Sequence, residues 1–111
     1  AQVGENVIIA GMSALAGSTI LEDDVTLAGQ TGVTGHLRIG RGTVVAARGL
    51  VAGDIPPGSF VSGFPARPHA ENMRILAAQR RVPELLKTVA QLEKRLAALE
   101  AQLAADEADD A

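Results

Sequence analysis

An aliphatic residue recurs at every sixth position over the first half of the chain. The series is Val3, Ile9, Leu15, Leu21, Leu27, Val33, Ile39, Val45 and Val51, and Pro57 closes it. Neither the 3.6-residue period of a helix nor the two-residue period of a plain strand gives this spacing. A short strand followed by a tight corner, repeated, does give it, as in a parallel β-solenoid. We therefore expect residues 1–58 to form the coils of a β-solenoid.

The same period predicts how the coils stack. If three repeats complete one triangular coil, residues eighteen apart lie above one another, separated by about 4.8 Å. The expected interior columns are Val3–Leu21–Ile39, Ile9–Leu27–Val45 and Leu15–Val33–Val51. The corners are expected to turn at small residues and glycines, which are Gly11, Gly17, Gly29, Gly35 and Gly53. Two outward columns are free of charge, namely Ile8–Thr26–Val44 and Ala14–Gly32–Leu50, and apolar residues outside a solenoid indicate an interface.

The second half of the chain has a different pattern. Pro56, Pro57 and Gly58 predict the end of the coils, because proline cannot donate to a strand ladder. Residues 59–68 are expected to form an exit loop, and residues 69–105 two helices, the second beginning close to Pro83. The acidic tail, residues 106–111, is expected to be disordered.

The second helix carries apolar residues spaced alternately four and three apart. They are Leu85, Val89, Leu92, Leu96, Leu99 and Leu103. This spacing is typical of a coiled-coil seam. With Val89, Leu96 and Leu103 at a positions, Arg95 occupies a g position and Glu100 the following e position, and these two meet across chains in a parallel bundle.

Composition narrows the functional classes. The chain has no Cys, Trp or Tyr and only two Phe, so the core is a thin aliphatic column and thiolate metal sites are excluded. No apolar run is long enough to span a membrane and no signal peptide is recognised, so we expect a cytoplasmic protein without a transmembrane segment. A glycine-rich phosphate loop and aromatic–basic interleaving are both missing from the sequence, which argues against ATP and nucleic acid as ligands.

The net charge of −3 conceals an uneven distribution of charge. Residues 36–83 hold seven arginines against only Asp54 and Glu71. This region is either a surface for an acidic partner or a set of solvated arginines spread around the coils, and the sequence leaves both interpretations open.

The repeats, in a form such as Ile39-Gly40 followed by four variable residues, resemble those of the hexapeptide-repeat acyltransferases. Residues 27–40 resemble the region around the second active-site histidine of the UDP-3-O-acylglucosamine N-acyltransferases. The Ser62–Ala66 loop, Pro83-Glu84-Leu85 and the Leu-Glu-Lys-Arg-Leu segment that follows resemble the C-terminus of that family. The resemblance covers residues 3 to about 100.

This resemblance implies an all-β left-handed parallel β-helix with an α-helical extension, assembled as a homotrimer with active sites between subunits. The implied reaction moves a 3-hydroxyacyl chain from acyl carrier protein to the 2-amino group of UDP-3-O-acylglucosamine in lipid A biosynthesis. No metal and no bound cofactor are implied, and the acyl carrier protein enters as a co-substrate.

Two parts of the family pattern are not found in the chain. The general-base histidine of the family lies in an Ile-Ala-His-Asn-Val motif, which would fall before Ala1, and the uridine-binding domain would lie further upstream. We therefore expect this chain to be a C-terminal piece that is inactive alone. The sequence leaves two alternative functions open: a small acetyltransferase that uses acetyl-CoA, and a non-catalytic trimeric scaffold.

Two positions, His36 and Asp54, are expected to lie close to the chemistry. His36 falls at a corner and, by the resemblance, serves as an auxiliary donor to the oxyanion, while Asp54, one coil later at the same corner, would orient its ring. The alternative for His36 is a surface histidine bonded to Asp54 or to solvent. His69 is expected to be a solvent-exposed residue at a helix start, and two histidines without cysteines do not predict a zinc site within one chain.

The remaining candidates concern the acyl donor. Gly63, Phe64, Pro65 and Ala66 resemble the loop that meets the pantetheine arm in these acyltransferases, although the same residues also serve simply as the exit from the last coil. Three arginines that follow are candidates for binding the acidic face of acyl carrier protein: Arg74, Arg80 and Arg81.

Overall fold

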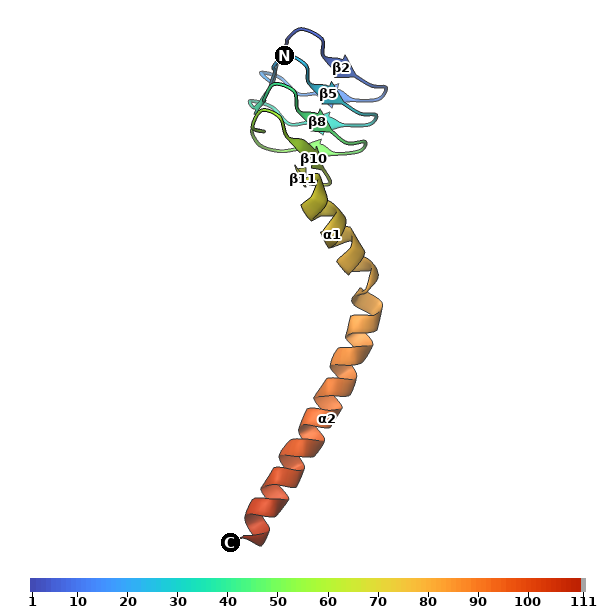
Figure 1. The fold of residues 1–111 in the computed structure, drawn as a ribbon, viewed down its shortest axis with the longest axis vertical. Coiled ribbons are helices and arrows are strands. Elements are labelled where there is room, and N and C mark those ends of the chain that lie inside the picture. Colours follow the sequence, from blue (N-terminus) through green and yellow to red (C-terminus); the bar gives the residue numbers. More distant parts are fainter. Residues whose placement is uncertain (111) are drawn as a thin grey trace. The chain divides into compact units, whose positions relative to one another are not determined.

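The computed structural model describes residues 1–110 and consists of a parallel β-solenoid followed by two helices (Figure 1). The strands are β1 (Gln2–Val3), β2 (Ile8–Ile9), β3 (Ala14–Leu15), β4 (Ile20–Leu21), β5 (Thr26–Leu27), β6 (Gly32–Val33), β7 (Arg38–Ile39), β8 (Val44–Val45), β9 (Leu50–Val51), β10 (Phe60–Ser62) and β11 (Arg67–Pro68). They form three sheets, ordered β1-β4-β7, β2-β5-β8-β10-β11 and β3-β6-β9, over the described residues. The stacking of β2, β5, β8 and β10 can be followed in Figure 1. The predicted solenoid is confirmed.

The interior follows the expected register through the first two coils. Leu21 lies between Val3 and Ile39, and Leu27 lies between Ile9 and Val45. These columns fill the core, in which Leu27, Ile39 and Val45 have no exposed surface. The threonines two positions before Leu21, Val33 and Val45 are buried too, and their hydroxyl groups donate to backbone carbonyl oxygens. Thr31, for example, donates to Ala28 O at 2.7 Å.

The corners are built differently from the prediction. The left-handed backbone falls on none of the expected glycines. Four of these glycines, Gly11, Gly17, Gly29 and Gly35, instead precede a left-handed residue. The non-glycine residues with a left-handed backbone are Asn6, Met12, Ser18, Asp24, Gln30, His36 and Arg48, with φ between 56° and 62°. Such a conformation costs a residue with a side chain about 1–2 kcal/mol. The cost is offset by a hydrogen bond to the neighbouring coil, since the N–H of Gln30 donates to Gly11 O at 3.0 Å. Gly35 is needed for another reason: a Cβ there would lie 3.0 Å from Gly17 O.

The eighteen-residue register changes after Val51. Val51 pairs with Val33, but Ile55 bridges to Ile39 and Val61 pairs with Val45, which are separations of only sixteen residues. The corner at residues 52–54 is therefore two residues shorter than the corner below it. Asp54 consequently stacks next to Arg38 and not above His36, which corrects the predicted alignment.

The coils also continue further than predicted. Strand β10 pairs in parallel with β8, so residues 60–62 belong to the solenoid and not to an exit loop, and β11 then pairs antiparallel with β10. The two prolines fit into the coil because the hydrogen bonds to the neighbouring coil are made by backbone groups other than the missing proline N–H groups. Ile55 supplies its N–H to Arg38 O, and the carbonyl oxygen of Pro56 accepts from the hydroxyl group of Thr43 at 3.1 Å.

Two helices follow, α1 (His69–Arg80) and α2 (Val82–Asp109), and Pro83 lies in the first turn of α2 as predicted. The predicted disorder from residue 106 is wrong for residues 106–109, which continue the helix. Alanines at positions 104, 105 and 108 are strong helix formers, and Gln102 Nε2 donates to Asp106 Oδ1 at 3.1 Å. Residue 111 lies outside the described residues.

The described chain divides into two compact units. The first comprises Ala1–Arg74, and the second begins at Ile75 and includes all of α2. No side chain of α2 is buried, and its apolar seam residues are between 49% and 62% exposed. Among the described helices, none combines the length and apolar character needed to cross a membrane.

Candidate functional site

His36 occupies the corner between β6 and β7, one coil before the corner at residues 52–54 where the register changes. Its backbone has φ 60°, and its N–H donates to Gly17 O at 3.1 Å. Because the next corner is two residues shorter, the position above His36 is left open. A shallow pocket of about 330 Å³ results, lined by Ser18, Ile20, His36, Leu37, Arg38 and Asp54. The sequence predicted the histidine at a corner, whereas the open space beside it comes from the shortened coil.

Asp54 lines this pocket but is held by a different partner than expected. Its Oδ1 accepts the backbone N–H of Arg38 at 2.8 Å. Within residues 1–110 no hydrogen bond joins Asp54 to the ring of His36. The structure therefore brings both side chains to one pocket, and an orienting contact between them stays a prediction.

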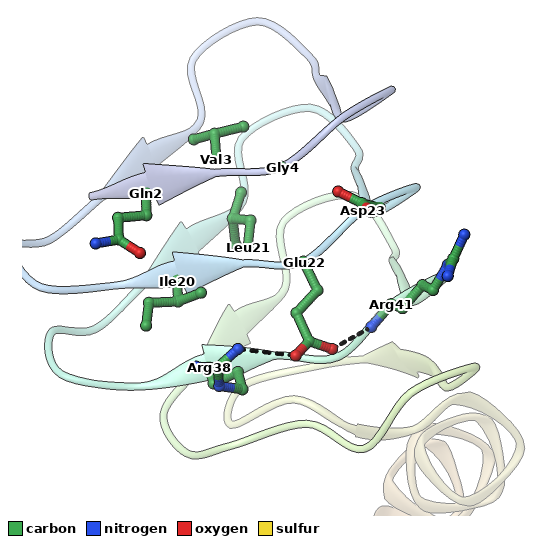
Figure 2. A pocket seen from close by; sticks show the side chains of 9 residues that line it. All are labelled: Gln2, Val3, Gly4, Ile20, Leu21, Glu22, Asp23, Arg38 and Arg41. Carbon is green, nitrogen blue, oxygen red and sulfur yellow. Dashed lines mark hydrogen bonds and ion pairs between the residues drawn. The ribbon is translucent and has the colours of Figure 1, made fainter.

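A second pocket adjoins the first, because Ile20 and Arg38 line both. It has a volume of about 480 Å³ and runs along β1, β4 and β7. Its lining, drawn in Figure 2, is Gln2, Val3, Gly4, Ile20, Leu21, Glu22, Asp23, Arg38 and Arg41. The two pockets together give this face of the solenoid a polar hollow beside His36.

Glu22 organises the second pocket. Figure 2 shows its carboxylate between two donors: Arg41 N–H at 2.9 Å and Arg38 Nη1 at 2.8 Å. The backbone hydrogen bond from Arg41, with that from the Arg38 side chain, holds the pKa of Glu22 below its usual value. Arg41 Nε also lies 3.5 Å from Asp24 Oδ2, so a second ion pair connects the same two successive coils.

We expect these contacts to make folding stability depend on pH below neutrality. A carboxyl group whose pKa is lowered in the folded state stabilises the fold above its unfolded pKa, and this contribution is lost as the pH falls through the folded pKa. The thermal midpoint of the chain should thus fall as the pH is lowered below about 4.5, the ordinary value for Glu22. The Glu22→Gln variant should be less stable than the parent at pH 7, and its thermal midpoint should fall less when the pH is lowered. Parallel midpoint curves for the two proteins would contradict this expectation.

The loop after β10 is held by α1. Gly63 has φ 96°, a value that favours glycine, and the side chain of Asn72, only 8% exposed, lies where a Cβ of residue 63 would be. The peptide bond between Phe64 and Pro65 is cis, and Phe64 is 77% exposed. Ala66 N–H donates to the carbonyl oxygen of Leu50. The loop thus presents one large aromatic side chain on a fixed backbone.

His69 is not the solvent-exposed residue that the sequence predicted. Its Nδ1 lies 2.9 Å from the hydroxyl oxygen of the buried Ser62, and its ring stacks on Phe60 with centroids 4.4 Å apart. The missed signal was Phe60-Val61-Ser62, an alternating strand pattern hidden behind the two prolines. Both ring contacts are structural, since they fasten the start of α1 to the last coil.

The three candidate arginines are exposed. Arg74 belongs to the first unit, and Arg80 and Arg81 belong to the second. None of them forms an ion pair with another described residue. Among residues 1–110, no group of three histidine or acidic side chains lies close enough together to hold a metal ion.

Comparison with known proteins gives several relatives. The chain is 42% identical over 88 residues to a UDP-3-O-acylglucosamine N-acyltransferase of Methylobacterium sp. (strain 4-46), a match that covers 74% of this chain and 25% of the relative. A second is an acyl-[acyl-carrier-protein]–UDP-N-acetylglucosamine O-acyltransferase of Paracoccus denitrificans, 36% identical over 80 residues, covering 72% of this chain and 30% of the relative. No family model matches the chain.

Among solved structures, a hexapeptide-repeat acetyltransferase from Vibrio cholerae, in complex with acetyl coenzyme A, superposes with a TM-score of 0.52. The sequence identity is 21%, and the match covers 60% of this chain and 57% of that one. At this identity the likeness supports the fold alone. The chain spans about a quarter of the length of the N-acyltransferase it matches. Over about three quarters of its own length, this chain is similar in sequence to the UDP-3-O-acylglucosamine N-acyltransferases, as its motifs predicted.

Proposed function

We propose that this chain is part of an N-acyltransferase of lipid A biosynthesis, which moves a 3-hydroxyacyl group from acyl carrier protein to the 2-amino group of UDP-3-O-acylglucosamine. The observation that carries the proposal is the 42% identity to N-acyltransferases across 74% of the chain. The open pocket beside His36 supports it, because it leaves a histidine accessible on a rigid corner.

In this reaction the amine nitrogen attacks the carbonyl carbon of the thioester. The carbonyl oxygen gains negative charge, the C–S bond then breaks, and the pantetheine sulfur leaves as a thiol after receiving a proton. A ring N–H of His36 would donate to the oxygen while it is charged, which is an interaction made only in the transition state. Asp54 would keep the backbone of Arg38 fixed at the edge of the pocket through its hydrogen bond to the Arg38 N–H.

Attack by the amine also needs a base to take up a proton. The second histidine, His69, is bonded to Ser62 and stacked on Phe60, so it is committed to holding α1. With His36 assigned as the donor, neither histidine of this chain serves as the base. We therefore assign the base to a part of the enzyme outside residues 1–111, and we expect this chain alone to be inactive.

Two groups of residues are assigned to the acyl donor. Phe64, exposed on the fixed Gly63–Ala66 loop, would contact the pantetheine arm. Acyl carrier protein is acidic, and Arg74, Arg80 and Arg81, which form no ion pair within residues 1–110, would attract it. No bound cofactor is required, since the acyl group arrives on its carrier. A reaction between a carrier protein and a nucleotide sugar would take place in the cytoplasm.

The site would lie between copies of the chain in a homotrimer. The outward column of sheet β2-β5-β8-β10 is apolar, because Ile8, Val44 and Phe60 are 59%, 38% and 52% exposed. The predicted column of Ile8, Thr26 and Val44 is thus extended by Phe60, which pairs with Val44. Burying such a face against the open pocket of a neighbouring subunit would exclude water from His36.

The test is a chimaera in which this chain replaces the matching segment of the Methylobacterium enzyme. The chimaera should transfer a 3-hydroxyacyl group from acyl carrier protein to UDP-3-O-acylglucosamine, and residues 1–111 alone should not. A chimaera that folds and binds the sugar nucleotide but transfers nothing would overturn the proposal. Transfer from acetyl-CoA instead of the carrier protein would support the acetyltransferase alternative, which the V. cholerae likeness raises at the level of fold.

A further inference from the structure

Asp54 is a carboxylate in the His36 pocket that has no cationic partner among residues 1–110. Three side chains that can carry a charge line this pocket: His36, Arg38 and Asp54. The guanidinium group of Arg38 is already paired with Glu22 at 2.8 Å, and within residues 1–110 Asp54 takes part in no ion pair. A carboxylate that lines a pocket in this state can accept a charge-assisted hydrogen bond from an N–H group of a ligand.

The hydrogen bonding of Asp54 fixes its position and leaves one oxygen available. Oδ1 accepts the backbone N–H of Arg38 at 2.8 Å, which holds the carboxylate against β7, the strand that follows His36. Over the residues that the structure describes, Oδ2 accepts no hydrogen bond, and the ring of His36 is not bonded to either oxygen. A fixed acceptor and a histidine therefore share one pocket without occupying each other, and a reacting group can contact both.

We propose that Asp54 is a catalytic residue that binds the amino group of the acceptor sugar through Oδ2, an inference that rests on the proposed function. As the amine attacks the thioester, its lone pair forms the new C–N bond and the π electrons of the carbonyl group move to oxygen. The nitrogen thus becomes positive while the oxygen becomes negative. His36 donates to the oxygen, and Asp54 accepts one N–H of the nitrogen. The base takes the other N–H proton and passes it to the sulfur, which leaves as a thiol when the C–S bond breaks.

This role differs from orienting the ring of His36, and it selects the chemical class of the acceptor. An attacking amine has two protons, so one can go to the base while the other stays bonded to Asp54. An attacking hydroxyl group has a single proton, which the base removes, and its oxygen lone pairs would then face a carboxylate. The relatives of this chain include both an N-acyltransferase and an O-acyltransferase by name. Asp54 thus favours an amine acceptor over a hydroxyl acceptor.

The first experiment measures binding, which does not require acyl transfer. Isothermal titration at pH 7 compares UDP-3-O-acylglucosamine with its analogue that carries a hydroxyl group at C2, using the chimaera described above. The parent should prefer the amine, and Asp54→Asn should reduce this preference about fivefold, the upper end for an exposed ion pair. An amide oxygen still accepts the Arg38 N–H, and a general loss of structure would weaken both ligands equally. No preference in the parent, or the same preference in Asp54→Asn, would overturn the inference.

The second experiment measures transfer to the amine acceptor. Asp54→Asn should lower kcat about tenfold with a nearly unchanged thermal midpoint, the lower end for a hydrogen bond to a charged group because the pocket is open. The matched control is Asp24→Asn, which removes the same charge from a corner residue that lines neither pocket. It should retain near-normal kcat, and equal kcat values for the two variants would contradict the role of Asp54. A chimaera that shows the amine preference but transfers nothing would support the amine site and overturn the proposed function, so the two failures are distinguishable.

Discussion

Replacing His36 with alanine should lower the kcat of the chimaera by about 10²–10³-fold, the usual loss when one donor to an oxyanion is removed. The side chain projects into an open pocket and contributes nothing to the core, so the thermal midpoint should hardly change. The binding of the carrier protein should also be nearly unaffected, because the proposed contact forms only in the transition state. Steady-state kinetics with varied carrier protein separates kcat from KM.

The matched control is Gln30→Ala, at a different corner with nearly the same backbone, φ 58° against 60° for His36. It removes a side chain from a left-handed corner without touching the pocket and should retain near-normal kcat. Asp54→Asn should cause a smaller loss than His36→Ala, since an amide oxygen can still accept the Arg38 N–H. If His36→Ala has the same kcat as Gln30→Ala, His36 is a surface residue. A raised KM for the carrier with unchanged kcat would make it a pantetheine contact.

Gly40→Ala should destabilise the fold by about 1–3 kcal/mol, the usual cost of inserting a methyl group into packed structure. A Cβ at this position would lie 2.7 Å from both the carbonyl carbon of Pro56 and the Cα of Pro57. These are backbone atoms of the next coil and cannot rotate aside as a flexible side chain would. For a domain of this size, each kcal/mol lowers the thermal midpoint by about 4–8 °C.

Gly53→Ala is the control for this prediction. Nothing lies within 4 Å of a Cβ built at Gly53, and its φ is outside the left-handed region. Its stability should therefore stay within about 0.5 kcal/mol of the parent. Thermal unfolding followed by circular dichroism compares the two variants directly. Equal midpoints would mean that the last coil can move away from β7 at little cost.

The sequence predicted the solenoid because its signal is repeated and simple. One inward residue per six, as in Leu21, Leu27 and Ile39, leaves few structures that bury all of them. The corners were predicted less well because their conformation depends on hydrogen bonds between coils. Met12 and Arg48 take up a left-handed backbone that their own preferences would not favour.

The candidate site was predicted only in part, for a physical reason. His36 was placed at a corner from its position in the repeat, but the pocket beside it depends on how many residues the next corner contains. Two prolines masked the continuation of the repeat into Phe60–Ser62, so the two-residue shift could not be read from the period. The role of Glu22 between Arg38 and Arg41 was missed as well, since its partners lie 16 and 19 residues away and on different parts of the next coil.

The shortened corner at residues 52–54 shows how a repeat protein can acquire a cavity without altering its core. The buried residues on either side of the shortened corner stay aligned, because Val51 still pairs with Val33 and Ile55 with Ile39. Only the outward side chains change their alignment, shifting by two positions relative to the coil below. Corner length is thus a variable that can change independently of packing, and each insertion or deletion there exposes a different residue of the coil below. In such a scaffold, the reach and contents of a binding site can vary through loop length alone, while the stacked aliphatic residues stay the same.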